Sequence, residues 1–183
     1  GSAGPIAVRL ARFEAYYDSD EAWTWERMAL TRARIIAGNL REPLERAVEA
    51  AIAKPVPADE IRADAADMRA RLLRDKPAKS PWDLKLREGG LIEIEFIAQT
   101  AQLIARTRAA PSTRAALEML AEAGALKRDC VEQLLAAEED YAALTQLVRA
   151  AHGGGFDPDG ASAPFAERLA RAGNCGDLGA LAA

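Results

Sequence analysis

The sequence predicts an all-α fold, a helical bundle, from its composition and its apolar periodicity. Half of the 183 residues are hydrophobic, but only 5% are aromatic. Alanine, the strongest helix former, is abundant, whereas the strand-favouring residues Val, Ile, Thr and Tyr are sparse. Apolar residues recur at intervals of three and four, which is typical of amphipathic helices. A chain of this length can bury one sizeable core.

The expected organisation is one helical domain over residues 6–183. Residues 1–5, Gly-Ser-Ala-Gly-Pro, are expected to be either a linker or a remnant of expression cloning. Within the domain we expect N-terminal helices over 6–75, a central helix pair over 82–152 and short C-terminal helices over 160–183.

The N-terminal helices follow from caps and breakers in the sequence. A first helix is expected over 6–17, and Asp18–Asp20 offers caps for a second helix that stops at Ala37, before the left-handed terminator Gly38. Two further helices are expected over 43–53 and 58–74, followed by a basic linker. The fourth helix carries its apolar residues on one face: Ile61, Ala65, Met68 and Leu72.

A fifth helix is expected from Gly90 to Arg108. The period-two pattern of Leu91–Phe96 also fits a short strand, but the length of the apolar run favours a helix. On a helix, Glu93 and Glu95 diverge by about 200° and could not bind one metal ion together. On a strand they could, so the strand is the one geometry in which this chain alone would hold a metal.

The later helices are expected over 111–123, 127–151 and 164–172, with a frayed end from Gly173. The apolar seam of the long helix 127–151 suits antiparallel packing against the fifth helix. The glycine triplet Gly153–Gly155 follows a helix rather than opening one, so we reject it as a phosphate loop.

Charge and composition exclude several classes of function. The net charge of −4 gives no basic surplus for nucleic-acid binding. No apolar run approaches the roughly 20 residues of a membrane span, and we expect no secretory signal. Cys130, Cys175 and His152 are too few and too scattered for a disulfide framework or a zinc site, which favours the cytoplasm. Cys130 is expected to be a core residue.

The most informative segment is Trp82–Phe96, which sets a lysine, a glycine pair and two glutamates before an apolar helix. The first N–H groups of a helix lack intrahelical partners, so a helix start is a natural anion site. Buried glutamates lose hydration unless they are paired. The segment is therefore either an ion-pair lock within a helical core or one wall of a nucleotide site.

A second cluster of polar residues lies in the expected second helix. Helical spacing places Arg32 on an apolar stripe with Trp25, Ala29 and Ile36. A buried arginine requires a carboxylate or a phosphate. Arg32 either pairs with Glu93 or Glu95, or it faces a nucleotide phosphate together with Arg34. Trp25 is expected to lie in the core, and the position of Trp23 stays open.

Three runs of residues resemble the helical part of glutamine synthetase adenylyltransferases. They are Trp23–Glu26, Ala29–Arg34 and Lys85–Gln99, in this order. The resemblance extends from Gly4 to about Ala110, and it favours the adenylylating, C-terminal half of that bifunctional family.

The resemblance implies a helical domain beside a nucleotidyltransferase fold. The family's Gly-Ser motif and metal-binding aspartates have no counterpart here, so it implies no catalytic residue, no metal ligand and no activity of this chain alone. It implies ATP and Mg as cofactors of the intact enzyme, with none bound tightly here. The candidates for facing the nucleotide are Glu26, Arg32, Arg34, Lys85, Glu93 and Glu95.

The implied partners are the preceding nucleotidyltransferase domain and glutamine synthetase, with neither nucleic acid nor membrane. A rival interpretation is a regulatory module that docks glutamine synthetase or a PII-type signal protein. A third is a structural bundle with buried ion pairs of Arg32.

Overall fold

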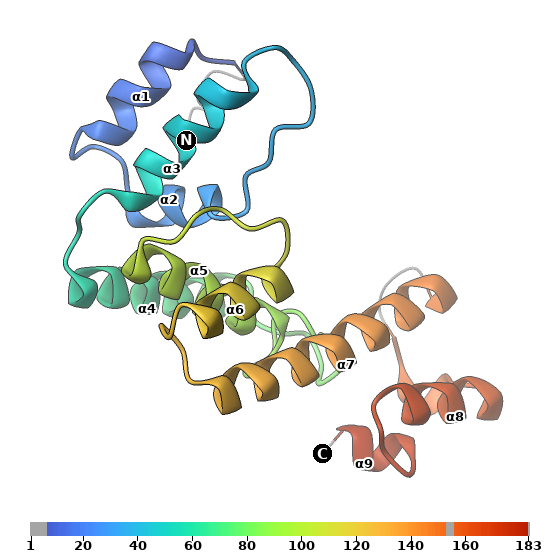
Figure 1. Ribbon diagram of the computed structural model, residues 1–183. Coiled ribbons are helices and arrows are strands. Elements are labelled where there is room, and N and C mark those ends of the chain that lie inside the picture. Colours follow the sequence, from blue (N-terminus) through green and yellow to red (C-terminus); the bar gives the residue numbers. More distant parts are fainter. Residues whose placement is uncertain (1–6, 153–155, 183) are drawn as a thin grey trace. The chain divides into compact units, whose positions relative to one another are not determined.

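The computed structural model describes residues 7–152 and 156–182, and these residues form helices and no strand (Figure 1). The all-α, helical-bundle prediction is therefore confirmed. Within this described part there are nine α-helices and one short 3₁₀ helix. Their bounds are α1 Leu10–Asp18, α2 Thr24–Leu30, α3 Arg41–Ala53, α4 Ala58–Asp75, α5 Leu91–Ala105, α6 Thr113–Glu122, α7 Arg128–His152, η1 Pro158–Gly160, α8 Ala163–Ala172 and α9 Leu178–Ala182.

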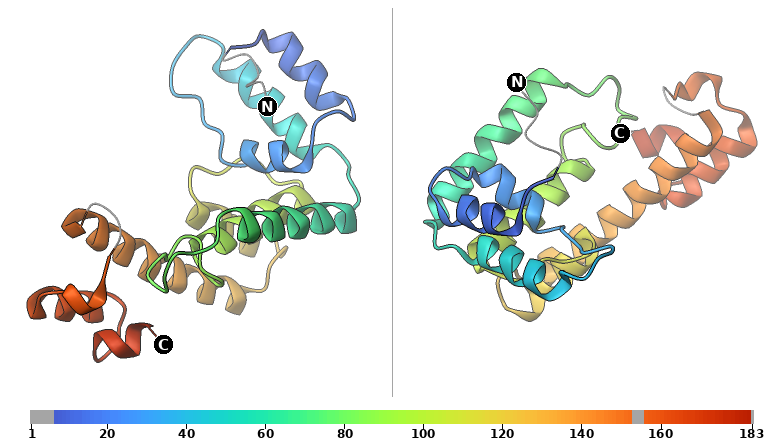
Figure 2. Two further views of the ribbon diagram at one scale, coloured as in Figure 1. Left: turned by 180° about the vertical axis from the view of Figure 1, so that it is seen from behind. Right: turned by 90° about the horizontal axis from the view of Figure 1, so that it is seen from above.

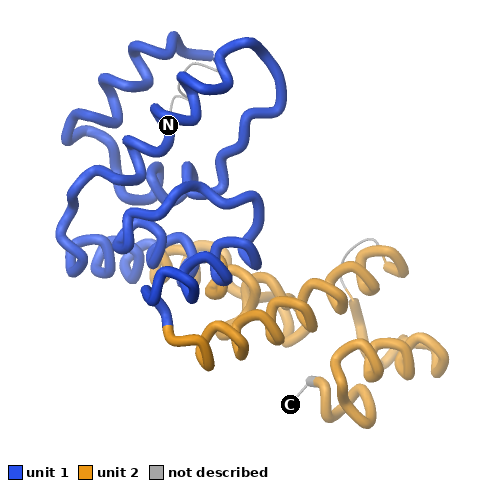
Figure 3. Tube along the Cα trace, viewed as in Figure 1, with its two compact units in different colours: residues 1–68, 96–126 blue, residues 69–95, 127–183 orange. Residues whose placement is uncertain are grey.

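The chain divides into two compact units that alternate along the sequence (Figure 3). Unit 1 comprises residues 1–68 and 96–126, and unit 2 comprises residues 69–95 and 127–183, in their described parts. Helices α4 and α5 each contribute residues to both units. The expected subdivision into consecutive helix groups, and the packing of the 127–151 helix on the fifth helix, stay predictions.

Unit 1 has its core where the apolar faces of its helices meet. Helices α1 and α2 both pack on α3, and Figure 2 shows α1 beside α3. The hydroxyl of Thr24, at the start of α2, donates to Asp64 of α4. The burial of Ile61 and Ala65 confirms the apolar face that their spacing predicts. The buried core residues are Met28, Val48, Ile52, Ile61, Ala65 and Leu103.

Unit 2 has a separate core under α7. Helix α8 packs on both α7 and α9. The ring of Trp82 meets that of Phe156 edge-on, with centroids 4.8 Å apart. The turn before α5 is thereby anchored to this core, whose buried residues are Leu84, Leu144, Val148, Phe156 and Leu169.

The second helix is much shorter than predicted, because Thr31 ends it. The Thr31 hydroxyl donates to the carbonyl of Met28 at 2.7 Å, and its N–H bonds the same carbonyl at 3.2 Å. The Thr31 carbonyl accepts the N–H of Ala110 at 2.8 Å. In a continuing helix that carbonyl would accept from Ile35. The prediction of a helix to Ala37 is therefore wrong, and residues 33–40 form a loop.

The fifth helix is confirmed, and two other expectations change. Leu91–Phe96 is helical and forms the beginning of α5, so the strand alternative for this segment is wrong. It ends at Ala105, because Arg106 adopts a positive φ of 53°. Cys130 is exposed rather than in the core. The triplet Gly153–Gly155 lies outside the described residues.

The C-terminal end also differs from the frayed segment expected after Gly173. Residues 178–182 form α9. The Asp177 carboxylate accepts the N–H of Ala180 at 2.8 Å, as an N-terminal helix cap does. Among the described residues, no helix has both the length and the apolar character that a bilayer crossing requires.

Candidate functional site

The turn over residues 80–90 folds back onto the first turn of α5 and fills its hydrogen bonds. The N–H of Leu91 donates to the carbonyl of Leu84 at 3.0 Å, and that of Ile92 to the carbonyl of Lys85 at 3.2 Å. The N–H of Glu93 donates to the carbonyl of Gly90 at 3.0 Å. Backbone carbonyls therefore occupy the first donors of α5, which are not free to bind an anion in this structure.

Gly89 and Gly90 are each required at their position for a different structural reason. Gly89 has a positive φ of 73°, which side chains disfavour. At Gly90, a Cβ atom would lie 2.7 Å from the carbonyl oxygen of Leu84 and 2.8 Å from that of Arg87. The pair thus closes the turn on the helix, and no phosphate is needed to explain it.

Glu93 forms an ion pair with Arg69. Its Oε1 atom accepts from Nε of Arg69 at 2.9 Å and also from Nη2 of Arg69. Its Oε2 atom accepts the N–H of Gly89 at 3.1 Å. Both oxygens are engaged within unit 2. The partner of Glu93 is Arg69, so this carboxylate forms its ion pair within unit 2.

Lys85 and Glu95 occupy different environments. Lys85 is exposed and lines a cavity of about 250 Å³ beside the turn. Glu95 is half-buried in the first half of α5. Since Glu95 lies two residues from Glu93 on a helix, the two carboxylates point in different directions.

Glu26 stabilises the beginning of α2. Its Oε2 atom accepts the N–H of Trp23 at 2.9 Å and the hydroxyl of Tyr16 at 2.6 Å. The hydrogen bond to Glu26, more than burial, raises the pKa of Tyr16 to about 12. Burial, followed by the charge of Glu26, raises the pKa of Tyr17. The position of Glu26 is thus explained by local structure.

Arg32 and Arg34 are exposed, since they follow the end of α2. Trp25 is also exposed, at 51%, which contradicts its assignment to the core, and Trp23 is 64% exposed. The buried arginine is Arg27, at 5% exposure, whose Nη2 atom donates to the carbonyl of Tyr17 at 3.4 Å.

Sequence reasoning missed Lys54 as well as Arg27. The Lys54 ammonium donates to the carbonyls of Asp18 and Ser19 at 2.7 and 2.5 Å, and to the Asp20 carboxylate at 2.9 Å. It therefore caps the C-terminus of α1. The hydrogen bond from Lys54 lowers the pKa of Asp20. The only signal in the sequence was a lysine just before the prolines that follow α3.

The six predicted site residues divide between the units. Glu26, Arg32 and Arg34 belong to unit 1, and Lys85, Glu93 and Glu95 to unit 2. Neither unit by itself gathers them into one site. In the part of the chain that the structure describes, no group of three or more His, Cys, Asp or Glu side chains is placed to hold a metal ion.

Two family models match the chain. The model described as glutamate-ammonia ligase adenylyltransferase matches residues 1–49. The model described as GlnD PII-uridylyltransferase matches residues 59–155, which is more than half of the chain.

Curated relatives match over nearly all of the chain. Each is named a bifunctional glutamine synthetase adenylyltransferase/adenylyl-removing enzyme. The protein of Mesorhizobium japonicum is 38% identical over 100% of this chain, that of Agrobacterium fabrum 36% over 97%, and that of Rhizobium meliloti 41% over 97%.

The chain spans 19% of the length of these relatives. Trp23–Arg34 lies within the first of the two matched ranges, and Lys85–Gln99 lies within the second. The chain belongs to the glutamine synthetase adenylyltransferase family, and its residues 59–155 also match the PII-uridylyltransferase family model.

Proposed function

We propose that the chain is the helical domain of the adenylylating half of a bifunctional glutamine synthetase adenylyltransferase. In the whole enzyme, AMP passes from ATP to a tyrosine of glutamine synthetase, in the cytoplasm, and regulates nitrogen assimilation. The observation that carries the proposal is the similarity, at 36–41% identity, of almost the whole chain to enzymes of that name.

The exposed apolar side chains support a docked neighbour. All the large exposed apolar residues found in the described part of the chain belong to unit 1, and five of the six fall between residues 8 and 40. We propose that these five side chains form one interaction surface, since exposed apolar patches mark such surfaces. We assign this surface to a nucleotidyltransferase domain of the same enzyme. The five residues are Val8, Trp23, Trp25, Ile36 and Leu40.

Arg32 and Arg34 would face the nucleotide from the loop after α2. Guanidinium groups bind phosphate oxygens in a fork, and both side chains are exposed. Lys85 and Glu95 stay candidates for the same role. Glu26 and Glu93 stay candidates as well, and both also make hydrogen bonds within their own units.

The two glutamates in the first half of α5 do not fit a magnesium site. Both oxygens of Glu93 are engaged by Arg69 and Gly89, and Glu95 lies elsewhere on the helix. We therefore assign ATP and Mg²⁺ to the nucleotidyltransferase domain, and we derive no catalytic step from this chain.

The test measures AMP incorporation into glutamine synthetase by this chain and by the full-length enzyme. We expect no transfer by the chain alone, and activity of the chain would refute the assignment.

In the full-length enzyme, Trp23→Ser with Trp25→Ser should lower the rate of AMP transfer at least tenfold by loosening the docked domain. Ile97→Ser is the matched control, because Ile97 is an exposed apolar residue of α5, outside this surface. Equal rates for both variants would disprove the docking surface.

A second candidate is a regulatory module that binds a PII-type signal protein. The match of residues 59–155 to a family described as PII-uridylyltransferase favours it. Calorimetry of this chain against a PII protein and against glutamine synthetase separates the two. Saturable binding to PII, with unchanged AMP transfer by the tryptophan variant, would favour the regulatory role.

A further inference from the structure

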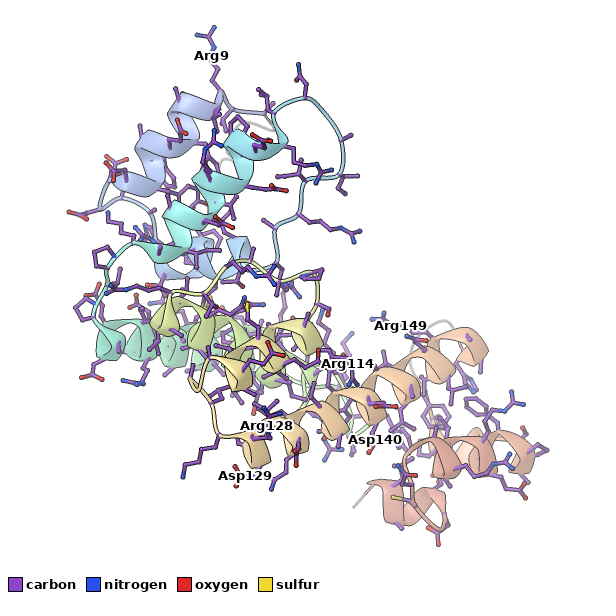
Figure 4. The ribbon with its side chains drawn as sticks, viewed as in Figure 1. Arg9, Arg114, Arg128, Asp129, Asp140 and Arg149 are labelled. Atoms are coloured by element: carbon purple, nitrogen blue, oxygen red, sulfur yellow. The ribbon has the colours of Figure 1, made fainter. Side chains whose placement is uncertain are left out.

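A small basic cavity lies in unit 2, beside the turn that precedes α5. Residues 79–85 form one wall, and the C-terminal part of α7 with Phe156 forms the other. The cavity is open to solvent and has a volume of about 250 Å³. Figure 4 shows Arg149, one of its lining residues, near the C-terminal end of α7.

Three cations line this cavity: Lys79, Lys85 and Arg149. Within the part of the chain that is described, none of the three takes part in an ion pair. The one carboxylate in the lining belongs to Asp83, and its Oδ1 atom accepts the N–H of Leu86 at 3.3 Å. The cavity is therefore a positive site in a chain whose net charge is −4.

Two hydroxyl groups add neutral donors. The Oγ1 atom of Thr145 is buried and has no hydrogen-bond partner, although Thr145 lines the cavity. A buried hydroxyl without a partner destabilises the fold, so a native structure needs a reason for it. The hydroxyl of Ser80 accepts the N–H of Trp82 at 3.2 Å, which leaves its own proton to donate.

We propose that this cavity binds a small phosphate-bearing anion. Its polar lining offers three cationic donors and two hydroxyl donors, which suit a tetrahedral group with several acceptor oxygens. The volume lies below the range of about 300–1,000 Å³ of sites for drug-sized ligands, so the ligand is compact. The rings of Trp82 and Phe156, one from each wall, meet edge-on and give an apolar surface for a small organic part. This inference concerns unit 2 alone and does not rest on the proposed function.

The test is calorimetric titration of the 183-residue chain with pyrophosphate at low ionic strength. We expect saturable binding at one site. Lys85→Ala with Arg149→Ala should weaken it at least about tenfold, because hydrogen bonds to charged groups are lost. The matched control carries Lys127→Ala with Arg128→Ala, which removes the same charge from exposed residues outside the cavity.

Three results would overturn the proposal. The first is the absence of saturable binding. The second is equal weakening by the cavity variant and its control, which indicates diffuse attraction of anions by the surface. The third is citrate binding as tightly as pyrophosphate, because the cavity would then not select phosphate.

Thr145→Val separates a ligand contact from a purely structural role. Valine fills the space of threonine but cannot donate a hydrogen bond. If the hydroxyl binds the anion, the variant keeps or raises its melting temperature without ligand and loses several-fold in pyrophosphate affinity. The opposite result is a Thr145→Val variant whose melting temperature rises by the same amount with and without pyrophosphate and whose affinity for pyrophosphate is unchanged. The hydroxyl would then contribute nothing to binding, and the proposal would fail at this residue.

Discussion

Arg69 binds Glu93 side-on, with its Nε atom 2.9 Å from Oε1 of Glu93 and its Nη2 atom on the same oxygen. The Arg69 side chain is 13% exposed and that of Glu93 is 32% exposed. The other Glu93 oxygen accepts a hydrogen bond from the N–H of Gly89. The Glu93 carboxylate therefore connects α4, the glycine turn and the first turn of α5 within unit 2.

Removing the charge of Glu93 should therefore destabilise the fold. Glu93→Gln leaves a mostly buried guanidinium without its counter-ion, and we expect the free energy of unfolding to fall by about 2 kcal/mol. Urea unfolding followed by circular dichroism measures it. Glu88→Gln is the control, because Glu88 is exposed. Identical midpoints for the two variants would show that the ion pair contributes nothing to stability.

The glycine turn gives a second prediction. Gly90→Ala places a methyl group within 2.8 Å of two backbone carbonyl oxygens, which cannot rotate away as a side chain can. We expect a loss of about 1–3 kcal/mol in unfolding free energy. Gly176→Ala should change it little, because nothing lies within 4 Å of the added Cβ and its φ is not positive. Equal stability of the two variants in thermal unfolding would contradict the close approach seen at Gly90.

Part of this fold was predictable because local signals agreed with the tertiary structure. The apolar face of α4 follows from the spacing of its residues, and the helix that starts at Leu91 follows from the length of its apolar run. The end of α2 does not, since it depends on the Thr31 carbonyl meeting Ala110, which lies 79 residues later in the sequence. Helix periodicity carries no information about such a contact.

The candidate site was less predictable than the fold for the same reason. The sequence identified Glu93 as a residue that needs a partner, but it could not show that Arg69 supplies it. The interpretation of Arg32 as buried depended on a helix continuing past Thr31. Once the helix ends there, Arg32 lies on the surface and Arg27 is the buried arginine.

Arg32 and Arg34 should consequently matter little for stability. Because both side chains are exposed, we expect each alanine variant to change the unfolding free energy by less than about 1 kcal/mol. If they face the nucleotide, the same variants of the full-length enzyme should raise the KM for ATP. A loss of several kcal/mol in the thermal unfolding of Arg32→Ala would instead restore the buried ion-pair interpretation.

The pair of Tyr16 and Glu26 makes stability depend on alkaline pH. The hydrogen bond to Glu26 raises the pKa of Tyr16 from 10.0 to about 12, so the folded state holds this proton more tightly than the unfolded chain does. The stabilisation is complete below pH 10 and is lost as the pH rises towards 12.

Phenolate absorbance against pH measures this directly. The difference between the wild-type chain and Tyr16→Phe isolates Tyr16 from the other two tyrosines. We expect Tyr16 to ionise near pH 12 in the wild type, and nearer pH 10 in Glu26→Gln, because the carboxylate charge is removed. Glu49→Gln, which alters an exposed carboxylate of α3, should leave the curve unchanged. Ionisation of Tyr16 near pH 10 in the wild type would show that Glu26 does not hold its hydroxyl in solution.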